Sequence, residues 1–273
     1  MYGHNMQGYI LNTYQHVFAK HACMYSSPAP PCMKRMLRIL FLLSGAIGLL
    51  LTSLFCSDSP ASEAPIYQID FTQAGKDGRA WLKKQGFTLK KDMTGGDELQ
   101  LLGTGNDKGL RMSTKEAAFG VAVKEGLSLK QIHRVVLEWG VEHYPAGASW
   151  EKQINREALM VTLFFGTPVK ADHFYLPDSP YFIGLFLCQG DKANIPYTAK
   201  SYQETARYVC LESPPPGITV SSEFKINEAY TKWFATESAP PLTGIGIEVD
   251  TSDLDPGRAA AFLKRITFYD DGK

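Results

Sequence analysis

Apolar and polar residues alternate most regularly in the middle of the chain, between His133 and His143. Every second residue from Val135 to Val141 is apolar, and Arg, Glu and Gly stand at several of the positions between and beside them. Alternation with a period of two predicts a strand that buries one face. Residues 158–165 and 181–188 are apolar at nearly every position, which predicts strands that are covered on both faces.

Shorter runs of the same kind recur along the rest of the chain, separated by Gly, Pro, Asn and Asp. Further strands are predicted at 66–71, 87–91, 98–102, 109–113, 118–123, 207–211, 218–224, 242–249 and 262–269. Helical spacing is confined to 79–85, a turn at 127–131, and 227–235, where Asn227 is expected to cap the helix. The pattern predicts an all-β fold, an antiparallel β-sandwich or jelly roll with one or two short helices.

A long apolar segment precedes this β-rich region. Leu37 to Cys56 is apolar apart from Arg38 and a few small polar residues, and Lys34 and Arg35 stand just before it. A basic cluster followed by such a run is typical of a signal peptide or an N-terminal membrane-anchor helix. Because basic residues remain on the cytoplasmic side, we expect the rest of the chain to lie outside the cytoplasm.

The end of the segment leaves its fate open. Leu51 to Cys56 resembles a bacterial lipoprotein signal, in which Cys56 would be lipidated, although Phe55 stands where that pattern has a small residue. An uncleaved anchor, simple cleavage and an ordinary thiol at Cys56 are the alternatives. The predicted organisation is a disordered or mis-assigned extension at 1–32, a signal or anchor at 33–56, a Ser/Pro-rich tether at 57–65, and a sandwich domain at 66–273.

Charge and cysteine content refine this prediction. The chain has 28 basic and 28 acidic residues, and the first 56 residues hold four basic and no acidic ones, which leaves 24 against 28 in the exported part. This mild acidic excess argues against a nucleic-acid partner. Cys188 and Cys210 each end an apolar run. They could form a disulfide in an oxidising compartment, or remain two buried thiols.

Polar and aromatic side chains are densest after the central strand. The candidate ligand-binding residues there are Glu142, His143, Tyr144, Trp150, Glu151, Asn155 and Arg156. Loops at the ends of sandwiches often bind ligands, and exposed aromatic rings can stack on sugars while the polar groups hydrogen-bond to hydroxyls. The same residue types could perform acid–base catalysis, with Glu142 or His143 as base and Tyr144 as acid. The alternative is a solvated loop in which Trp150 covers the edge of the core.

Three carboxylates in one turn form a weaker candidate site. Asp250, Asp253 and Asp255 could contribute to a calcium site, because Ca²⁺ takes six to eight oxygen ligands. Their spacing is not that of an EF-hand, and Asp is also common in turns. Apart from this calcium ion we expect no cofactor. Asp172–His173 is a further polar pair in a loop, and the chain carries no phosphate-binding loop, nucleophile elbow or zinc-protease motif.

Several segments resemble a family of exported bacterial proteins of unknown function. They are the strand Leu137–Val141, the helix end Thr231–Phe234, Gly244–Asp253 and the aromatic strand Ile266–Tyr269, with Leu137 standing where the family has a Trp. More loosely, the series of strands resembles jelly-roll carbohydrate-binding modules. Neither resemblance implies a catalytic residue.

We therefore predict an exported, membrane-tethered, non-catalytic β-sandwich. Its expected partners are the membrane, through the N-terminal segment, and a cell-envelope or periplasmic ligand, in the first place carbohydrate but alternatively an envelope protein. One alternative is a polysaccharide lyase or hydrolase on a jelly-roll frame that uses Glu142, His143, Tyr144 and Arg156. The other is a structural envelope protein.

Overall fold

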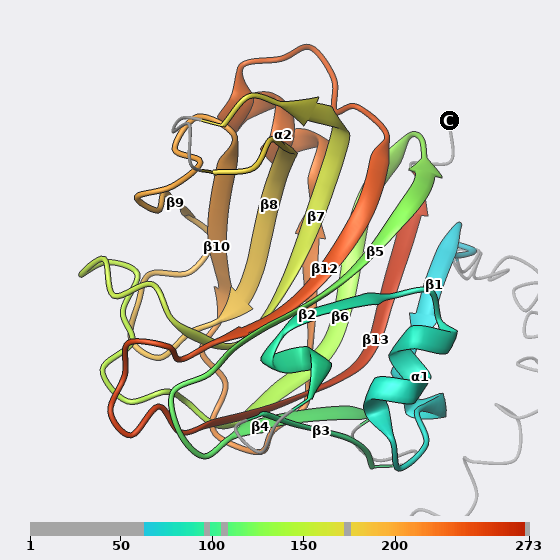
Figure 1. The fold of residues 1–273 in the computed structure, drawn as a ribbon. Coiled ribbons are helices and arrows are strands. Elements are labelled where there is room, and N and C mark those ends of the chain that lie inside the picture. The colour runs from blue at the N-terminus through green and yellow to red at the C-terminus, as the bar shows by residue number, and fades with distance from the viewer. Residues whose placement is uncertain (1–62, 96–98, 105–108, 172–175, 271–273) are drawn as a thin grey trace, which may run out of the picture. The chain divides into compact units, whose positions relative to one another are not determined.

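Two stacked β-sheets build the part of the chain that the structure describes (Figure 1). The structure is a computed structural model, and it describes residues 63–95, 99–104, 109–171 and 176–270. The chain divides into two units, Met1–Ala61 and Ser62–Lys273, and all described residues belong to the second. The predicted signal or anchor, the lipidation candidate Cys56 and the pair Asp172–His173 lie outside the described residues.

The first sheet has six strands and is antiparallel. Its order is β11-β6-β13-β4-β3, and β1 also pairs with β13. The strands are β1 (Tyr67–Asp70), β3 (Leu99–Gly103), β4 (Leu110–Thr114), β6 (Ile132–His143), β11 (Val220–Lys225) and β13 (Ala259–Asp270). The alternating segment of the sequence is β6, which lies between β11 and β13, and its inward-facing residue Trp139 is fully buried.

The second sheet has seven strands in the order β2-β5-β12-β7-β8-β10-β9. They are β2 (Thr88–Lys91), β5 (Phe119–Leu129), β7 (Glu157–Val169), β8 (Ser179–Leu187), β9 (Pro196–Tyr197), β10 (Ala206–Glu212) and β12 (Leu242–Asp250). Strands β7 and β8, whose sequences are apolar at nearly every position, lie inside the sheet, as predicted. All-antiparallel pairing was expected, but β8 and β10 run parallel. A parallel pair requires a long return connection, and residues 188–205, which include β9, provide it.

Helices are short and lie at opposite ends of the sheets in Figure 1. Helix α1 (Gly78–Lys84) begins after Asp77, whose side chain accepts a hydrogen bond from Ala80 N, and α2 (Ile226–Phe234) follows β11 directly. Two 3₁₀ turns, Phe71–Gln73 and Asp92–Thr94, complete the secondary structure of the described residues. None of the helices in this part of the chain has the length and apolar content needed to cross a membrane.

Two local predictions are wrong. The helical turn expected at 127–131 is strand, because β5 continues to Leu129. Gly126 adopts a positive φ of 78°, and the register between β5 and β12 shifts nearby. The glycine therefore lies in a β-bulge, and the strand continues after it. Asn227 does not cap α2, since it lies inside the helix. Its side-chain oxygen instead accepts a hydrogen bond from Ala239 N at 3.1 Å, which ties the following loop to the helix.

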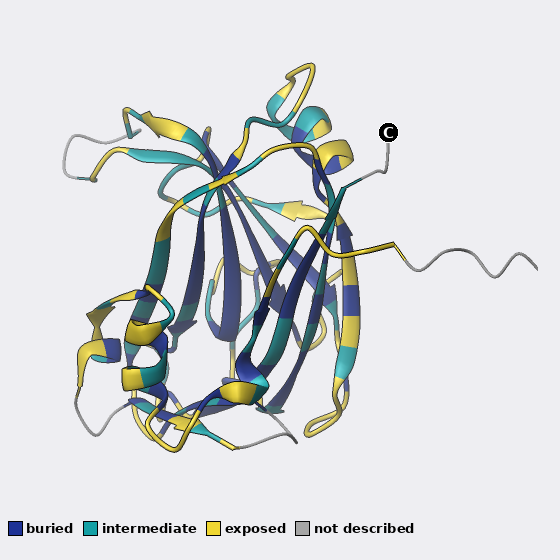
Figure 2. Ribbon diagram, turned by 90° about the vertical axis from the view of Figure 1, so that its right-hand side faces the viewer, coloured by how far each residue is buried: buried dark blue, intermediate teal, exposed yellow. Residues whose placement is uncertain are grey.

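The core lies between the sheets and is formed by the inward-facing residues of both. Figure 2 shows the buried residues in the strands and the exposed ones mainly in the loops. Trp139 and Phe268 of the first sheet and Phe165 of the second are among its largest fully buried side chains. The indole of Trp139 donates a hydrogen bond to Ser222 Oγ at 2.9 Å, so this buried N–H group has a partner. Trp233 of α2 is partly buried and packs against the core.

Candidate functional site

The outer face of the seven-stranded sheet, turned away from the core, has small residues at its centre. Strand register places five residues in one row across the strands β5, β12, β7, β8 and β10: Val123, Gly246, Thr162, Gly184 and Tyr208. Along β12 the outer positions are Gly244, Gly246 and Glu248, whereas Ile245 and Ile247 between them are fully buried. The alternation therefore leaves two outer positions of this strand without a side chain.

The ring of Phe164 lies over these glycines. A Cβ atom at Gly244 would be 3.5 Å from Phe164 Cδ2, and one at Gly246 would be 3.3 Å from Phe164 Cε2. Gly184 likewise leaves room for the ring of Tyr208, because a Cβ atom at Gly184 would be only 2.9 Å from Tyr208 Cδ1. Glycine at these positions thus lets aromatic rings lie down on the sheet, and Phe164 remains partly exposed.

Two adjoining hollows on this face form one groove, which we call the outer groove. Their volumes are about 490 and 240 Å³, and Phe164, Ser179 and Tyr202 line both. The smaller hollow contains Glu248 and Tyr208, and the larger extends over Gly244 to Pro177. A combined volume of this size lies within the range of small-ligand sites.

Aromatic contacts hold the groove walls in place. Phe182 packs against Phe164, Tyr202 and Tyr208, with ring centroids 5.6, 5.6 and 5.8 Å apart. The Tyr202 hydroxyl donates a hydrogen bond to Pro177 O at 2.9 Å, across the rim. The walls are therefore braced before any ligand enters, which reduces the entropy lost on binding.

The other end of the outer face is covered by the loop in which the sequence placed the candidate site. Trp150 is 4% exposed, and its ring packs against Tyr208 and Phe186 at centroid distances of 4.5 and 5.0 Å. Asp191 holds the loop down by accepting hydrogen bonds from Ser149 Oγ at 2.7 Å and Trp150 N at 3.0 Å. Trp150 therefore packs behind Tyr208, which lines the smaller hollow, and is not an exposed stacking platform.

Two carboxyl groups meet at the covered end of the groove. Glu157 at the start of β7 is 3% exposed, and it shares a hydrogen bond with Glu248 of β12. Burial, with the nearby charges of Glu248 and Asp250, raises the pKa of Glu157 well above its usual range. Burial, together with the charge of Asp250, raises the pKa of Glu248 to about 7. Among the described residues, no group donates a hydrogen bond to Glu157 Oε2. Because ionised carboxylates can only accept, the hydrogen bond between the two acids requires a proton on one of them.

Arg156 is the cation beside this pair. It forms ion pairs with Asp250, at 3.5 Å, and with Asp253, and its charge lowers the pKa values of Glu157 and Glu248. Four acidic side chains therefore surround one guanidinium. The resulting excess of acid favours keeping a proton on the Glu157–Glu248 pair.

The remaining sequence-predicted residues do not converge on the outer groove. Glu142 accepts a charge-assisted hydrogen bond from Arg111 at 2.6 Å, and His143 is exposed at the end of β6 in the other sheet. Asn155 is partly buried beside Arg156, to which its carbonyl oxygen is hydrogen-bonded at 2.5 Å. Glu151 is exposed, and its side chain accepts a hydrogen bond from Lys192 N at 3.0 Å.

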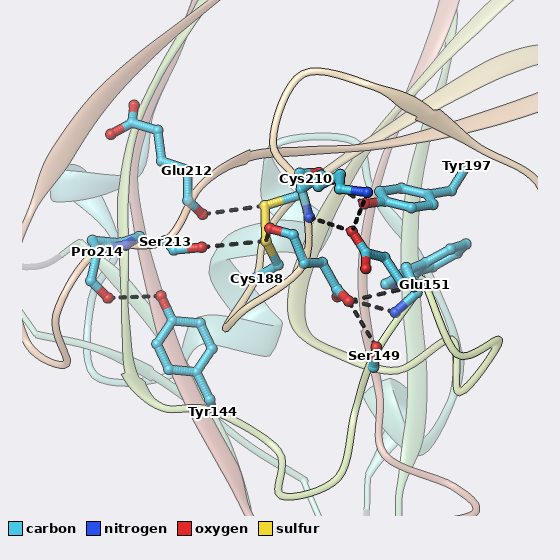
Figure 3. Close-up of a disulfide and its surroundings, with 12 residues drawn as sticks. Tyr144, Ser149, Glu151, Cys188, Tyr197, Cys210, Glu212, Ser213 and Pro214 are labelled. Carbon is cyan, nitrogen blue, oxygen red and sulfur yellow. Dashed lines mark hydrogen bonds and ion pairs between the residues drawn. A yellow bond between two sulfur atoms is a disulfide. The ribbon is translucent and has the colours of Figure 1, made fainter.

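Tyr144 is buried against the neighbouring connection (Figure 3). Its hydroxyl donates a hydrogen bond to Pro214 O at 2.8 Å, and burial raises the pKa of this phenol to about 12. Tyr144 and Arg156 line one small cavity of about 10 Å³, whereas Glu142 and His143 do not reach it. The four residues that the enzyme hypothesis required therefore do not share a substrate-sized site.

Cys188 and Cys210 form a disulfide in the same region (Figure 3). Cys188 follows β8, and Cys210 lies within β10. Because these two neighbouring strands run parallel, both cysteines lie near the same end of the sheet. The bond encloses residues 189–209, which include Tyr197, Tyr202 and Tyr208. It thereby closes the connection that carries the rim residue Tyr202 of the outer groove.

The three Asp residues proposed for calcium are engaged otherwise or exposed. Asp250 Oδ1 accepts hydrogen bonds from Ser252 N and Oγ at 2.9 and 2.7 Å, Asp253 pairs with Arg156, and Asp255 is exposed. Among the described residues, no three His, Cys, Asp or Glu side chains come close enough together to hold a metal ion.

Sequence reasoning missed the outer groove. Its signal was the segment Gly244–Glu248, in which glycine alternates with isoleucine and ends on an acid. This alternation predicts a strand with an apolar inner face and an outer face that lacks bulk.

Comparison with known proteins shows neither a family nor a function. No protein-family model matches the chain, and no curated protein matches its sequence. Among solved structures, one similar protein is a Bacillus subtilis protein of unknown function with a galectin-like fold, at 11% identity and a TM-score of 0.37, covering 76% of this chain and 96% of that one.

Two other similar structures carry sugar-related descriptions. The carbohydrate recognition domain of Emp46p has 10% identity and a TM-score of 0.36, covering 73% of this chain and 97% of its own. The module TmCBM61, solved with β-1,4-galactotriose, has 6% identity and a TM-score of 0.31, covering 74% and 99%. At TM-scores this low, these similarities do not indicate a function for this chain. The class that the structure itself defines is an all-β sandwich with two short helices.

Proposed function

We propose that this protein is a carbohydrate-binding β-sandwich whose ligand lies in the outer groove. The observation that carries the proposal is the ring of Phe164, which lies over Gly244 and Gly246 and is partly exposed inside the groove. A partly exposed aromatic ring held against a sheet can stack against the C–H face of a sugar ring.

Polar groups around the ring match the hydroxyls of a sugar. Ser179 lines both hollows, Thr162 and Glu248 line the smaller one, and Thr243 lines the larger. A mostly apolar concavity with a few hydrogen-bonding groups is typical of small-ligand sites. The braced walls also favour binding, because little side-chain motion remains to be lost.

The groove supports binding better than glycoside hydrolysis. Retaining glycosidases place their two carboxyl groups about 5–5.5 Å apart, and inverting enzymes about 6.5–9.5 Å apart, on either side of the scissile bond. Glu157 and Glu248 are hydrogen-bonded to each other, so a sugar ring does not fit between them. Glu157 is also buried and does not line the groove.

Retention of the purified full-length chain on a panel of immobilised polysaccharides tests the proposal. Phe164→Leu keeps an apolar side chain over the glycines but removes the ring, so we expect it to lose at least about tenfold in affinity. Tyr269→Leu is the matched control, because this partly exposed tyrosine lies on β13 of the other sheet. Equal retention of wild type and Phe164→Leu, or no retention of wild type across the panel, would refute the proposal.

We further propose that the chain is exported and tethered to a membrane by Leu37–Cys56. The basic residues before this apolar segment and the disulfide between Cys188 and Cys210 support this, since disulfides persist in oxidising compartments. Fractionation of expressing cells, with and without a protease added outside the cytoplasmic membrane, tests it. Tethering predicts a membrane-bound chain that the protease digests. Recovery of an intact, protected chain would contradict it.

A further inference from the structure

The charge of the outer groove indicates which sugars it accepts. Among the described residues that line it, three are acidic and one is basic: Glu125, Asp178 and Glu248 against Lys90. Glu125, Asp178 and Lys90 are exposed near the solvent, whereas Glu248 lies deeper and only partly exposed beside Tyr208. Charges in a concave, partly desolvated site interact more strongly than charges in open water.

The surroundings of Glu248 add to this acidity. Among the described residues, the charged groups that act on it are Glu157 from β7, Asp250 from β12 and Arg156, which precedes β7, and the titratable side chains beside it are Tyr208 from β10 and Tyr202. Arg156 is the sole cation in this set and is already paired with Asp250 and Asp253. The negative charge at this end of the groove therefore exceeds the positive charge of Arg156.

Building on the proposed function, we propose that the outer groove selects sugars that carry a positively charged amine, and that Glu248 is the residue that binds the ammonium group. The sugar ring stacks on Phe164, and its ammonium donates a hydrogen bond to the Glu248 carboxylate in the smaller hollow. When the ammonium binds, the proton shared by Glu157 and Glu248 leaves to solvent, and the ligand's positive charge takes its place. A uronic acid in the same position would bring a second anion to Glu248.

Binding of a defined oligomer pair tests this inference. The ligands are a glucosamine tetramer and its N-acetylated counterpart of the same length, which differ in the charge on nitrogen. Titration calorimetry with the full-length chain at pH 7 should show at least about tenfold tighter binding of the glucosamine tetramer, as expected for a charge-assisted hydrogen bond. Lowering the pH to 5 should reduce this preference, because protons then compete with the ammonium for Glu248.

Variants separate the inference from the proposed function. Glu248→Gln should abolish the preference for the amine, whereas Phe164→Leu should weaken both ligands, and Glu116→Gln, an exposed residue outside the groove, should change neither. Equal binding of both tetramers, an amine preference that survives Glu248→Gln, or failure of the glucosamine tetramer to bind would each overturn the inference. If polysaccharides are nevertheless retained in a Phe164-dependent way, the proposed function stands alone. If no polysaccharide is retained, both the inference and the proposed function are refuted.

Discussion

Replacing Glu248 by Gln should make the folded protein more stable than wild type at high pH. Folding raises the pKa of Glu248 from its ordinary 4.5 to about 7, so the folded chain holds a proton that the unfolded chain has released. The stability due to this protonated carboxyl is present in full below about pH 4.5 and is lost as the pH rises through 7. That pKa change corresponds to a loss of about 3 kcal/mol.

Gln cannot ionise, yet its amide can donate a hydrogen bond to Glu157 as the protonated carboxyl does. We therefore expect the unfolding free energy of Glu248→Gln to exceed that of wild type by about 1–3 kcal/mol at pH 8, and to match it closely at pH 4.5. Because all other titrating groups occur in both chains, the difference between their two pH profiles isolates the carboxyl pair.

Urea unfolding of both proteins at half-unit steps from pH 4.5 to 8 measures this difference. Glu116→Gln, an exposed carboxylate replaced in the same way, should follow wild type throughout. Parallel profiles for wild type and Glu248→Gln, or a variant that is less stable at pH 8, would show that no proton is held by this pair.

Two further predictions concern the frame of the sandwich. Reduction of the Cys188–Cys210 disulfide, which joins residues 22 positions apart, should lower the unfolding free energy by about 3 kcal/mol; urea midpoints with and without reductant measure this, and coinciding midpoints would contradict it. Ser222→Ala should cost about 1–2 kcal/mol because the Trp139 indole N–H loses its buried partner. Ser221→Ala on the exposed face of the same strand should cost almost nothing, and equal losses in the two variants would refute this account.

Much of the fold follows from alternation along the chain. The period of two in β6 and the apolar runs of β7 and β8 predicted the strands and their burial correctly, because side-chain direction in a strand depends only on local geometry. The parallel pairing of β8 with β10 could not be predicted in this way. It depends on the path of residues 188–205 across the sheet, and the conformational preferences of individual residues do not determine that path.

The candidate site depended on contacts that the sequence does not reveal. The sequence left Trp150 open between an exposed stacking ring and a cover for the edge of the core. The choice depends on Asp191, 41 residues away, which holds Trp150 against Phe186. Conversely, Gly246 and Gly184 are 62 positions apart, and only the register of β12, β7 and β8 brings them into one row. The glycine alternation of β12 was visible, whereas the row across the sheet required the structure.

The disulfide makes the rim of the groove part of a covalent ring. Tyr202 lies in the segment that Cys188 and Cys210 close, so the disulfide limits how far Tyr202 can move from the sheet. Doubling the length of a closed loop costs only about 0.6 kcal/mol. Insertions in the loop residues between these cysteines, outside β9 and β10, would therefore change the height and chemistry of one wall while both sheets keep their register. This gives the scaffold a place where ligand preference can diverge at little cost in stability.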